Sequence, residues 1–451
     1  MVEKAEKTEQ LPVDAIHEAI RGEDLSQLDA IFETLHPAEA ALLLESLPST
    51  ERKIIWELLY AKVGGEILTH LNDTVRADLM GQMESDELVA ATEGLDTDDL
   101  ADLIPEMPES VTQQILESLD KQNRERLEAV LTYPEDSAGG LMNIDTVTVR
   151  ADIDVDVVMR YLRRLGKLPE TTDNLMVVDR KGLYLGTLPL TALLTSKTDT
   201  EISAIMDPST EAISADSDET DVVRLFEHRD WVSAPVVDHT GKLLGRITID
   251  DIVDLIRDQG DHGFMGMAGL NEEDDIFAPA LKSSRRRTIW LGVNLLTALL
   301  ASWVIGQFDA TIEQLVALAI LMPVVASMGG IAGSQTLTLV IRAMALGQIS
   351  RHNSRTLLKK ELTVGLLNGS VWALVIGLVA YYWFDNMALG YVIAAAMVIN
   401  LSIAAFFGAI IPPLLKQAGA DPALAGGVIL TTVTDVIGFF AFLGLAAIFL
   451  V

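Results

Sequence analysis

The sequence contains no cysteine, and its first 280 residues contain few basic side chains. The lack of thiols excludes disulfides and thiolate metal sites. The chain has 33 Lys and Arg against 65 Asp and Glu, of which the residues from Leu281 onward hold ten and six. The first 280 residues therefore carry 23 basic and 59 acidic groups, a net charge of −36. Such a region repels nucleic acid and is stabilised by cations, although acidity alone also fits ordinary solubility.

The first ten residues lack the apolar run of a signal peptide, so we expect none to be cleaved. Charge is missing from long stretches of the last third, in which only Asp435 lies inside an apolar run. Each run exceeds the roughly 20 residues that span a bilayer as a helix. The sequence therefore predicts a multi-pass membrane protein with an α-helical transmembrane domain of five spans. The runs are 288–308, 314–341, 362–384, 386–415 and 422–451.

The loops between these runs alternate in charge. Basic side chains precede the first span and fill the loop between the second and third, from Arg342 to Lys360. In the loops after the first and third spans the only charged residues are acidic, namely Asp309, Glu313 and Asp385. Because basic loops stay in the cytoplasm, we expect a cytoplasmic N-terminus, an outside C-terminus and insertion in the plasma or inner membrane.

The second span is rich in small and hydroxyl residues between Pro323 and Thr338. Glycine and serine at this density suit close helix packing, and they also suit a water-filled lining where oxygens face ions. Taken alone, this segment fits packing somewhat better than a pore lining.

The fifth span changes that balance, because Asp435 is ionisable and lies well inside an apolar helix. A carboxylate there costs several kcal/mol unless it meets a cation, a polar partner or water. One interpretation is a protonated Asp bonded to a neighbouring helix, and the other is a cation site. Thr431, one turn earlier, can add an oxygen. No basic side chain lies deep in another span, which favours a transported cation.

The cytoplasmic part divides into two patterns. Residues 10–135 show apolar positions spaced by three and four, punctuated by proline, and predict an acidic all-α superhelical domain with helices over 31–47, 75–83 and 111–131.

Residues 136–260 contain a repeat, because 175–186 aligns without a gap on 234–245. Each copy predicts two strands, an Asp-x-x-Gly turn and a helix. The repeat resembles a tandem CBS pair, an α/β module that commonly senses adenosine nucleotides or ions. One site at most keeps the ribose and phosphate pattern, at Gly245, Thr248 and Asp251.

Acidic clusters stand at several predicted helix starts, around Asp98, Asp218 and Asp251. For any single cluster, complementarity to the helix dipole is the better interpretation. Three clusters on adjoining domains also match the oxygen ligands that Mg²⁺ prefers.

The order of these parts resembles the MgtE family of magnesium channels. Three segments carry the resemblance: Tyr133–Met142 at the start of the CBS pair, Pro323–Gln335 in the second span and Thr434–Gly438 in the fifth. Many members carry Asn where this chain has Ile331 and Ser334. The resemblance covers nearly the whole chain and implies four parts: a helical domain at 10–135, CBS domains at 136–260, a linker or plug helix at 261–287 and the transmembrane domain at 288–451.

The resemblance also implies a homodimer with a pore on its two-fold axis, lined by the second and fifth spans. Mg²⁺ is then both substrate and regulator, and moves into the cytoplasm. The pore residues implied are Asp435, Thr431, Ser334, Thr338 and Gly330. Cytoplasmic Mg²⁺ is expected to be shared between the helical domain and the CBS pair, and to close the pore through the linker helix around 275–287. The implied ligands are Glu66, Asp98, Asp102, Asp218, Asp230, Asp251 and Asp254.

Other functions remain open at this point. A proton- or sodium-coupled divalent cation exchanger would use Asp435 as a proton carrier. A membrane-embedded hydrolase would need two close carboxylates, and the spans of one chain supply only one, so we expect no enzyme. A nucleotide sensor merely anchored in the membrane would not need five spans.

Overall fold

The computed structural model describes residues 16, 31–32, 35–92, 95, 97–119, 121–169, 171–270, 275–350 and 352–451. The chain divides into two compact units. The first is Met1–Gln259 with Glu273–Pro279, and the second is Gly260–Glu272 with Ala280–Val451.

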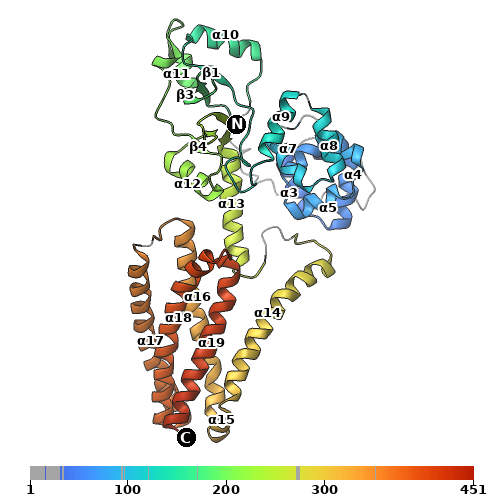
Figure 1. Ribbon diagram of the computed structural model, residues 1–451. Coiled ribbons are helices and arrows are strands. Elements are labelled where there is room, and N and C mark those ends of the chain that lie inside the picture. The colour runs from blue at the N-terminus through green and yellow to red at the C-terminus, as the bar shows by residue number, and fades with distance from the viewer. Residues whose placement is uncertain are drawn as a thin grey trace, which may run out of the picture. The chain divides into compact units, whose positions relative to one another are not determined.

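The first unit begins with a helical domain whose apolar side chains face inward. Leu43, Leu44, Leu79 and Val111 are buried in one cluster. Caps define the helix starts, as where the Asn72 Oδ1 atom accepts from the Val75 amide at 2.9 Å. The described elements are α3 (Pro37–Glu45), α4 (Ser49–Thr69), α5 (Asp73–Met80), α6 (Ser85–Thr92), α7 (Thr97–Leu103), η1 (Ile104–Glu106), α8 (Glu109–Ser118) and α9 (Lys121–Val130) (Figure 1).

The prediction of one helix over 111–131 was wrong. Helix α8 ends at Ser118, because Leu119 adopts an extended conformation with φ −72° and ψ 148°. Helix α9 then begins at Lys121. The apolar spacing of three and four is interrupted here, because no apolar residue lies between Leu119 and Leu127.

The CBS pair consists of two small sheets with the same topology, which confirms the repeat. In each sheet the first two strands are parallel and the last two antiparallel. The strands are β1 (Thr148–Arg150), β2 (Asn174–Val178), β3 (Tyr184–Pro189), β4 (Ile213–Ser214), β5 (Ser233–Val237) and β6 (Leu243–Thr248). The helices are α10 (Val155–Leu165), α11 (Leu190–Thr195), η2 (Ile202–Ala204), α12 (Glu219–Arg229) and α13 (Ile249–Gly266).

The two hairpin turns have matching geometry. The Asp179 Oδ1 atom accepts from the amides of Lys181 and Leu183, at 2.7 and 2.9 Å. Asp238 makes the corresponding bonds in the second copy, and Gly182 and Gly241 have φ values of 81° and 82°. A side chain is strained at such φ, which explains why each turn ends in glycine.

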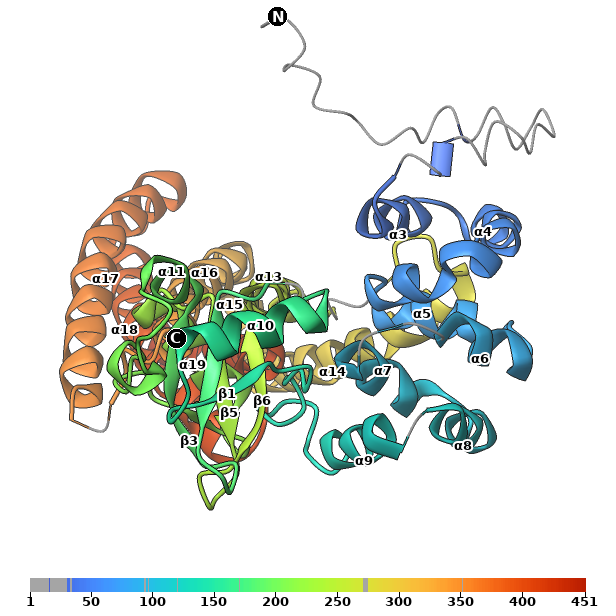
Figure 2. The same ribbon diagram turned by 90° about the horizontal axis from the view of Figure 1, so that it is seen from above.

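The second unit holds five helices long and apolar enough to cross a membrane, counted over the described residues. Helix α18 packs against α16, α17 and α19, while α14 packs against α19. Figures 1 and 2 both show α17 beside α18. The elements are α14 (Ala280–Gly306), α15 (Asp309–Gln314), α16 (Ala317–Ala345), α17 (Ser354–Phe384), α18 (Met387–Gln417) and α19 (Pro422–Phe449).

The linker differs from the expected separate helix at 275–287. Helix α13 continues to Gly266, and α14 begins at Ala280 and runs unbroken into the first span. Between Pro279 and Gly292 the sequence has no residue that breaks a helix. The residues from Ala280 to Arg287 are therefore the first two turns of the spanning helix.

Candidate ion-conducting site

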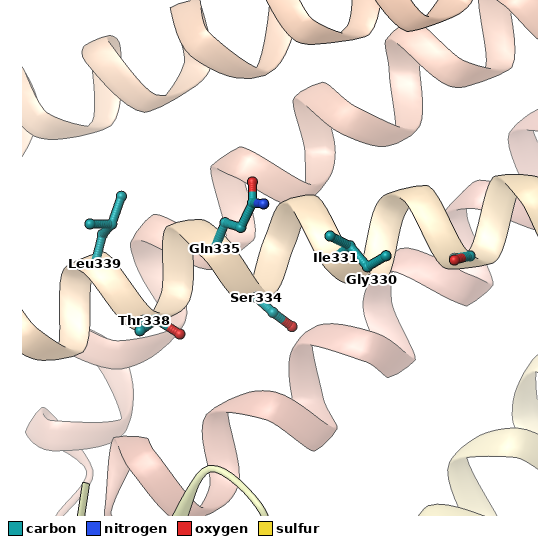
Figure 3. A pocket seen from close by; sticks show the side chains of 7 residues that line it. Gly330, Ile331, Ser334, Gln335, Thr338 and Leu339 are labelled. Carbon is teal, nitrogen blue, oxygen red and sulfur yellow. The ribbon is translucent and has the colours of Figure 1, made fainter. Parts of the chain in front are cut away.

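One face of α16 borders an open hollow of about 800 Å³. Figure 3 shows its side chains along the helix. Three of the predicted pore residues border the hollow, Gly330, Ser334 and Thr338, and all three belong to one helix. The full lining is Ser327, Gly330, Ile331, Ser334, Gln335, Thr338 and Leu339.

The opposite face of α16 is packed tightly against its neighbours. Gly329 and Gly333 are buried there. A Cβ atom on Gly333 would lie 2.9 Å from the Leu430 side chain on α19. Glycine therefore lets the helices approach closely on this face, as the packing interpretation of the second span expects.

Linker residue Met267 contacts the α16 face that borders the hollow. The Thr338 hydroxyl donates to the Met267 Sδ atom at 3.5 Å. Met267 follows directly after α13 and lies in the range 261–287 that was predicted as a linker. The residue that reaches Thr338 is therefore earlier in the chain than the expected plug around 275–287.

The fifth span begins at a strong cap. Both carboxylate oxygens of Asp421 accept from the first turn of α19: Oδ1 from the Ala423 amide at 2.9 Å and Oδ2 from the Leu424 amide at 3.0 Å. Pro422 occupies the first helical position, where no amide is needed. The same Oδ2 atom lies 3.2 Å from the His262 Nε2 atom near the end of α13.

Asp435 lies in the middle of α19 and is half-buried. It makes no hydrogen bond or ion pair with any described residue, so no basic side chain in the described part of the second unit neutralises it. The Thr431 hydroxyl donates to the carbonyls of Gly427 and Val428, at 3.0 and 3.1 Å. Neither Asp435 nor Thr431 lines the hollow on α16, so one chain does not bring the predicted pore residues together.

Two buried polar side chains of the spans were missed in the sequence. Glu361 falls just before the predicted span 362–384, yet it lies in α17 and is 2 % exposed. Asn400 lies in α18 and is fully buried. A lone amide in an apolar run was the available signal for Asn400, whereas Glu361 adjoins a basic loop and reads as part of it.

In the helical domain, Glu66 lies near His70, which was not among the predicted site residues. Glu66 is on α4, and Asp254 of α13 acts on the same imidazole, that of His70. Burial lowers the pKa of His70, and the two carboxylates oppose that shift. Glu66 and Asp254 are thus close enough to His70 to influence its charge.

The other predicted regulatory ligands are spread out. Asp102 is on α7 near Arg76, which is also paired with Asp73 and Glu106. The side chain of Asp98 lies outside the described residues. Asp218 caps the start of α12 and Asp230 ends the same helix in a left-handed conformation. Eleven helical residues separate these two, a length of about 17 Å.

The described residues hold no group of three His, Asp or Glu side chains that converges as a metal site. The shared Mg²⁺ ligands therefore stay a prediction.

The predicted nucleotide strand is β6. Asn143 covers Gly245, where a Cβ atom would lie 2.6 Å from the Asn143 carbonyl oxygen. Thr248 is buried and donates to the Asp251 Oδ2 atom at 3.2 Å. The Thr and Asp of the pattern are therefore in contact at the start of α13.

In the described residues, five apolar helices long enough to cross a membrane follow a CBS pair, and one of them carries the half-buried Asp435. This organisation is that of a multi-pass membrane transport protein. Three family profiles match: the divalent cation transporter MgtE at 322–445, the MgtE intracellular N domain at 35–136 and the CBS domain at 202–258. The chain belongs to the MgtE family of divalent cation transporters.

Its similarity to named proteins extends over most of its length. The chain is 32% identical to the magnesium transporter MgtE of Thermus thermophilus, over 97% of this chain and 98% of that protein. It is 27% identical to the magnesium transporter MgtE of Bacillus subtilis, over 96% of each. A crystal structure of the cytosolic domain of the Mg²⁺ channel MgtE in complex with ATP is 33% identical, with a TM-score of 0.49, and covers 54% of this chain and 99% of that one. The relatives are named as transporters rather than as enzymes.

Proposed function

We propose that this protein is a channel that moves Mg²⁺ into the cytoplasm, and that Asp435 holds the passing ion. The observation that carries the proposal is the half-buried carboxylate in α19, which has no hydrogen-bond or ion-pair partner among the described residues. An isolated carboxylate at this depth is stabilised by a cation. Mg²⁺ keeps several of its waters and touches one or two carboxylates, so a hydrated ion fits one Asp from each of two chains.

A homodimer completes the site. The hollow on α16 is open, and its lining comes from one helix. A second copy facing it would enclose the hydroxyls of Ser334 and Thr338 and the backbone at Gly330. It would also bring two Asp435 carboxylates toward each other, whose repulsion a divalent cation relieves. Thr431 would lie one turn away from each.

Cytoplasmic Mg²⁺ is the proposed regulator, with the N-terminus in the cytoplasm and the C-terminus outside. The net charge of −36 in the first 280 residues supports this, because divalent cations would reduce the repulsion. The ligands proposed are those predicted above: Glu66, Asp98, Asp102, Asp218, Asp230, Asp251 and Asp254. The contact between Met267 and Thr338 supports a linker that closes the cytoplasmic end of the path.

An adenosine nucleotide at the second CBS copy is proposed at β6, around Gly245, Thr248 and Asp251. The contact between Thr248 and Asp251 supports it, since these two side chains form one polar group at a helix start. Its test is a shift in the thermal unfolding midpoint on adding ATP. The shift should be lost in Thr248→Val, which keeps the shape and removes the hydroxyl.

The function is tested by Mg²⁺ uptake into liposomes that contain the purified protein. Asp435→Asn should abolish most uptake, whereas Glu313→Gln removes a charge at an exposed position of α15 and should not. Uptake that survives Asp435→Asn would remove the central site. Uptake that needs an imposed proton or sodium gradient, without channel currents in a planar bilayer, would favour the exchanger.

A further inference from the structure

Glu361 is a buried carboxylate that the proposed conduction path does not use. It lies in the third turn of α17, where its side chain is almost fully enclosed. Its Oε1 atom is 2.6 Å from the Lys360 Nζ atom, and its Oε2 atom accepts from the Thr336 hydroxyl at 3.3 Å. A carboxylate is costly to enclose, so these two contacts define what it can do.

The contact with Thr336 reaches the helix that lines the hollow. Two positions along an α-helix differ by about 200° in direction. Thr336 therefore points almost directly away from Ser334 and Thr338, which are its neighbours two positions before and after it. The burial pattern agrees, because Thr336 is buried while Ser334 and Thr338 are exposed. Glu361 holds α16 from behind, at the same level as the two hydroxyls of the hollow.

A second polar contact holds the same face of α16 further along. The Asn400 Nδ2 atom donates to the Val325 carbonyl at 2.8 Å. The Asn400 side chain occupies the space beside Gly329 and Gly438, neither of which has a Cβ atom. Between the two contacts, Gly408 of α18 lies so close to α16 that a Cβ atom there would be 2.8 Å from the Gly333 carbonyl oxygen.

We propose that Glu361, together with Asn400, is a positioning residue for ion passage. Through Thr336 it fixes the rotation of α16 about its own axis, and so the direction in which Ser334 and Thr338 point. This inference rests on the proposed function, because it assigns Glu361 a role in conduction. The ordinary alternative is a pair that only neutralises Lys360 and stabilises the fold. That alternative does not require the Thr336 hydroxyl.

The test uses the natural lack of cysteine in the chain. Ser334→Cys places one thiol in the hollow, and its reaction rate with a water-soluble maleimide reports where this face of α16 points. Thr336→Val keeps the shape and removes the donor, while Thr336→Ser keeps the donor. We expect Thr336→Val to lower Mg²⁺ uptake about threefold to tenfold, the range for one interhelical hydrogen bond in a membrane. It should also change the labelling rate, and Thr336→Ser should restore both.

Glu361→Gln is the second change of a double-mutant cycle with Thr336→Val, because Gln keeps an acceptor oxygen and loses the charge. If Glu361 acts through Thr336, the double variant Thr336→Val/Glu361→Gln should be no worse than the stronger single variant. Effects that multiply would overturn the proposal, as would a Thr336→Val protein with unchanged uptake and labelling. If the wild type itself takes up no Mg²⁺, the proposed function fails, and the labelling rates still decide whether Glu361 positions α16.

Discussion

Arg52 of α4 forms a bidentate ion pair with Asp275, the residue five positions before α14. The distances are 2.9 Å from Nη1 to Oδ2 and 3.1 Å from Nη2 to Oδ1, and both side chains are almost fully buried. The guanidinium also donates to the carbonyls of Leu44 and Leu47, at 2.9 and 3.0 Å. The helical domain therefore holds the segment Asp275–Pro279 directly, which agrees with its membership of the first compact unit.

Removing one member of this ion pair should lower the free energy of unfolding of the protein. Arg52→Met leaves the Asp275 carboxylate enclosed without its partner, and we expect a loss of about 3–5 kcal/mol. The double variant Arg52→Met/Asp275→Leu should recover much of this loss, because no charge is then left behind. Thermal unfolding of the purified full-length protein in detergent measures both. Arg124→Met is the control, since the Arg124–Glu128 pair is exposed and should contribute less than about 1 kcal/mol. Equal midpoints for the single and double variants would contradict the expectation.

Adjacent glycines of α16 should respond differently to an added methyl group. A Cβ atom on Gly329 collides with the Asn400 amide, whereas nothing lies within 4 Å of a Cβ atom on Gly330. Gly329→Ala should therefore lower the thermal midpoint of the protein in detergent, by an amount typical of overpacking, about 1–3 kcal/mol. Gly330→Ala should leave that midpoint unchanged. Similar midpoints for the two would show that Asn400 is not tightly held against α16.

The stability of the first unit should fall at mildly acidic pH because of His70. Burial lowers the pKa of His70 below its ordinary value of 6.5, so the folded state binds its proton less readily than the unfolded state does. The contribution of His70 is favourable above pH 6.5 and is lost as the pH falls from 6.5 toward the lowered pKa. Thermal midpoints at pH 7.5 and 5.5 should therefore differ more in the wild type than in His70→Gln. The same difference in both proteins would exclude His70 as the cause.

Glu219 at the start of α12 should respond in the opposite sense. Burial and the nearby carboxylates of Asp218 and Asp136 raise its pKa, so the folded state disfavours the charged form. Glu219 does not lower the free energy of unfolding below the ordinary pKa of 4.5, and it lowers that free energy increasingly as the pH rises through the raised pKa. Glu219→Gln should raise the thermal midpoint at pH 7.5 without Mg²⁺, and added Mg²⁺ should stabilise the wild type more than this variant.

The control for this change is Glu227→Gln, on an exposed position of the same helix. It removes the same formal charge away from the crowded carboxylates. If both variants gain equally in the midpoint, the effect is one of total charge rather than of the local group around Glu219.

Features set by local pattern could be predicted from the sequence, and contacts across the fold could not. The five spans were found within a few residues, except that α14 and α17 begin eight residues earlier than expected, because a charged end can continue a helix beyond the bilayer. The repeat was found because strands and turns leave a short-range signature. The shared irregularity of register, at Val177 and Val236, was not predicted.

Arg52, Glu361 and Asn400 were missed because their partners lie 223, 25 and 75 residues away in the chain. Such pairs depend on how whole helices pack, and no spacing within one helix encodes them. The candidate site was predictable only in part. The spacing of Ser334 and Thr338 places them on one face of a helix, whereas the position of Asp435 relative to that face depends on how the helices assemble.

Asp421 has a double role whose effect extends along α19. Its Oδ2 atom serves the Leu424 amide and also faces the His262 imidazole. The start of α19 is therefore held both by its own first turn and by the end of α13. Fourteen residues, about four turns, connect this cap to Asp435. One carboxylate thus ties the end of α13 to the helix that carries the intramembrane Asp435.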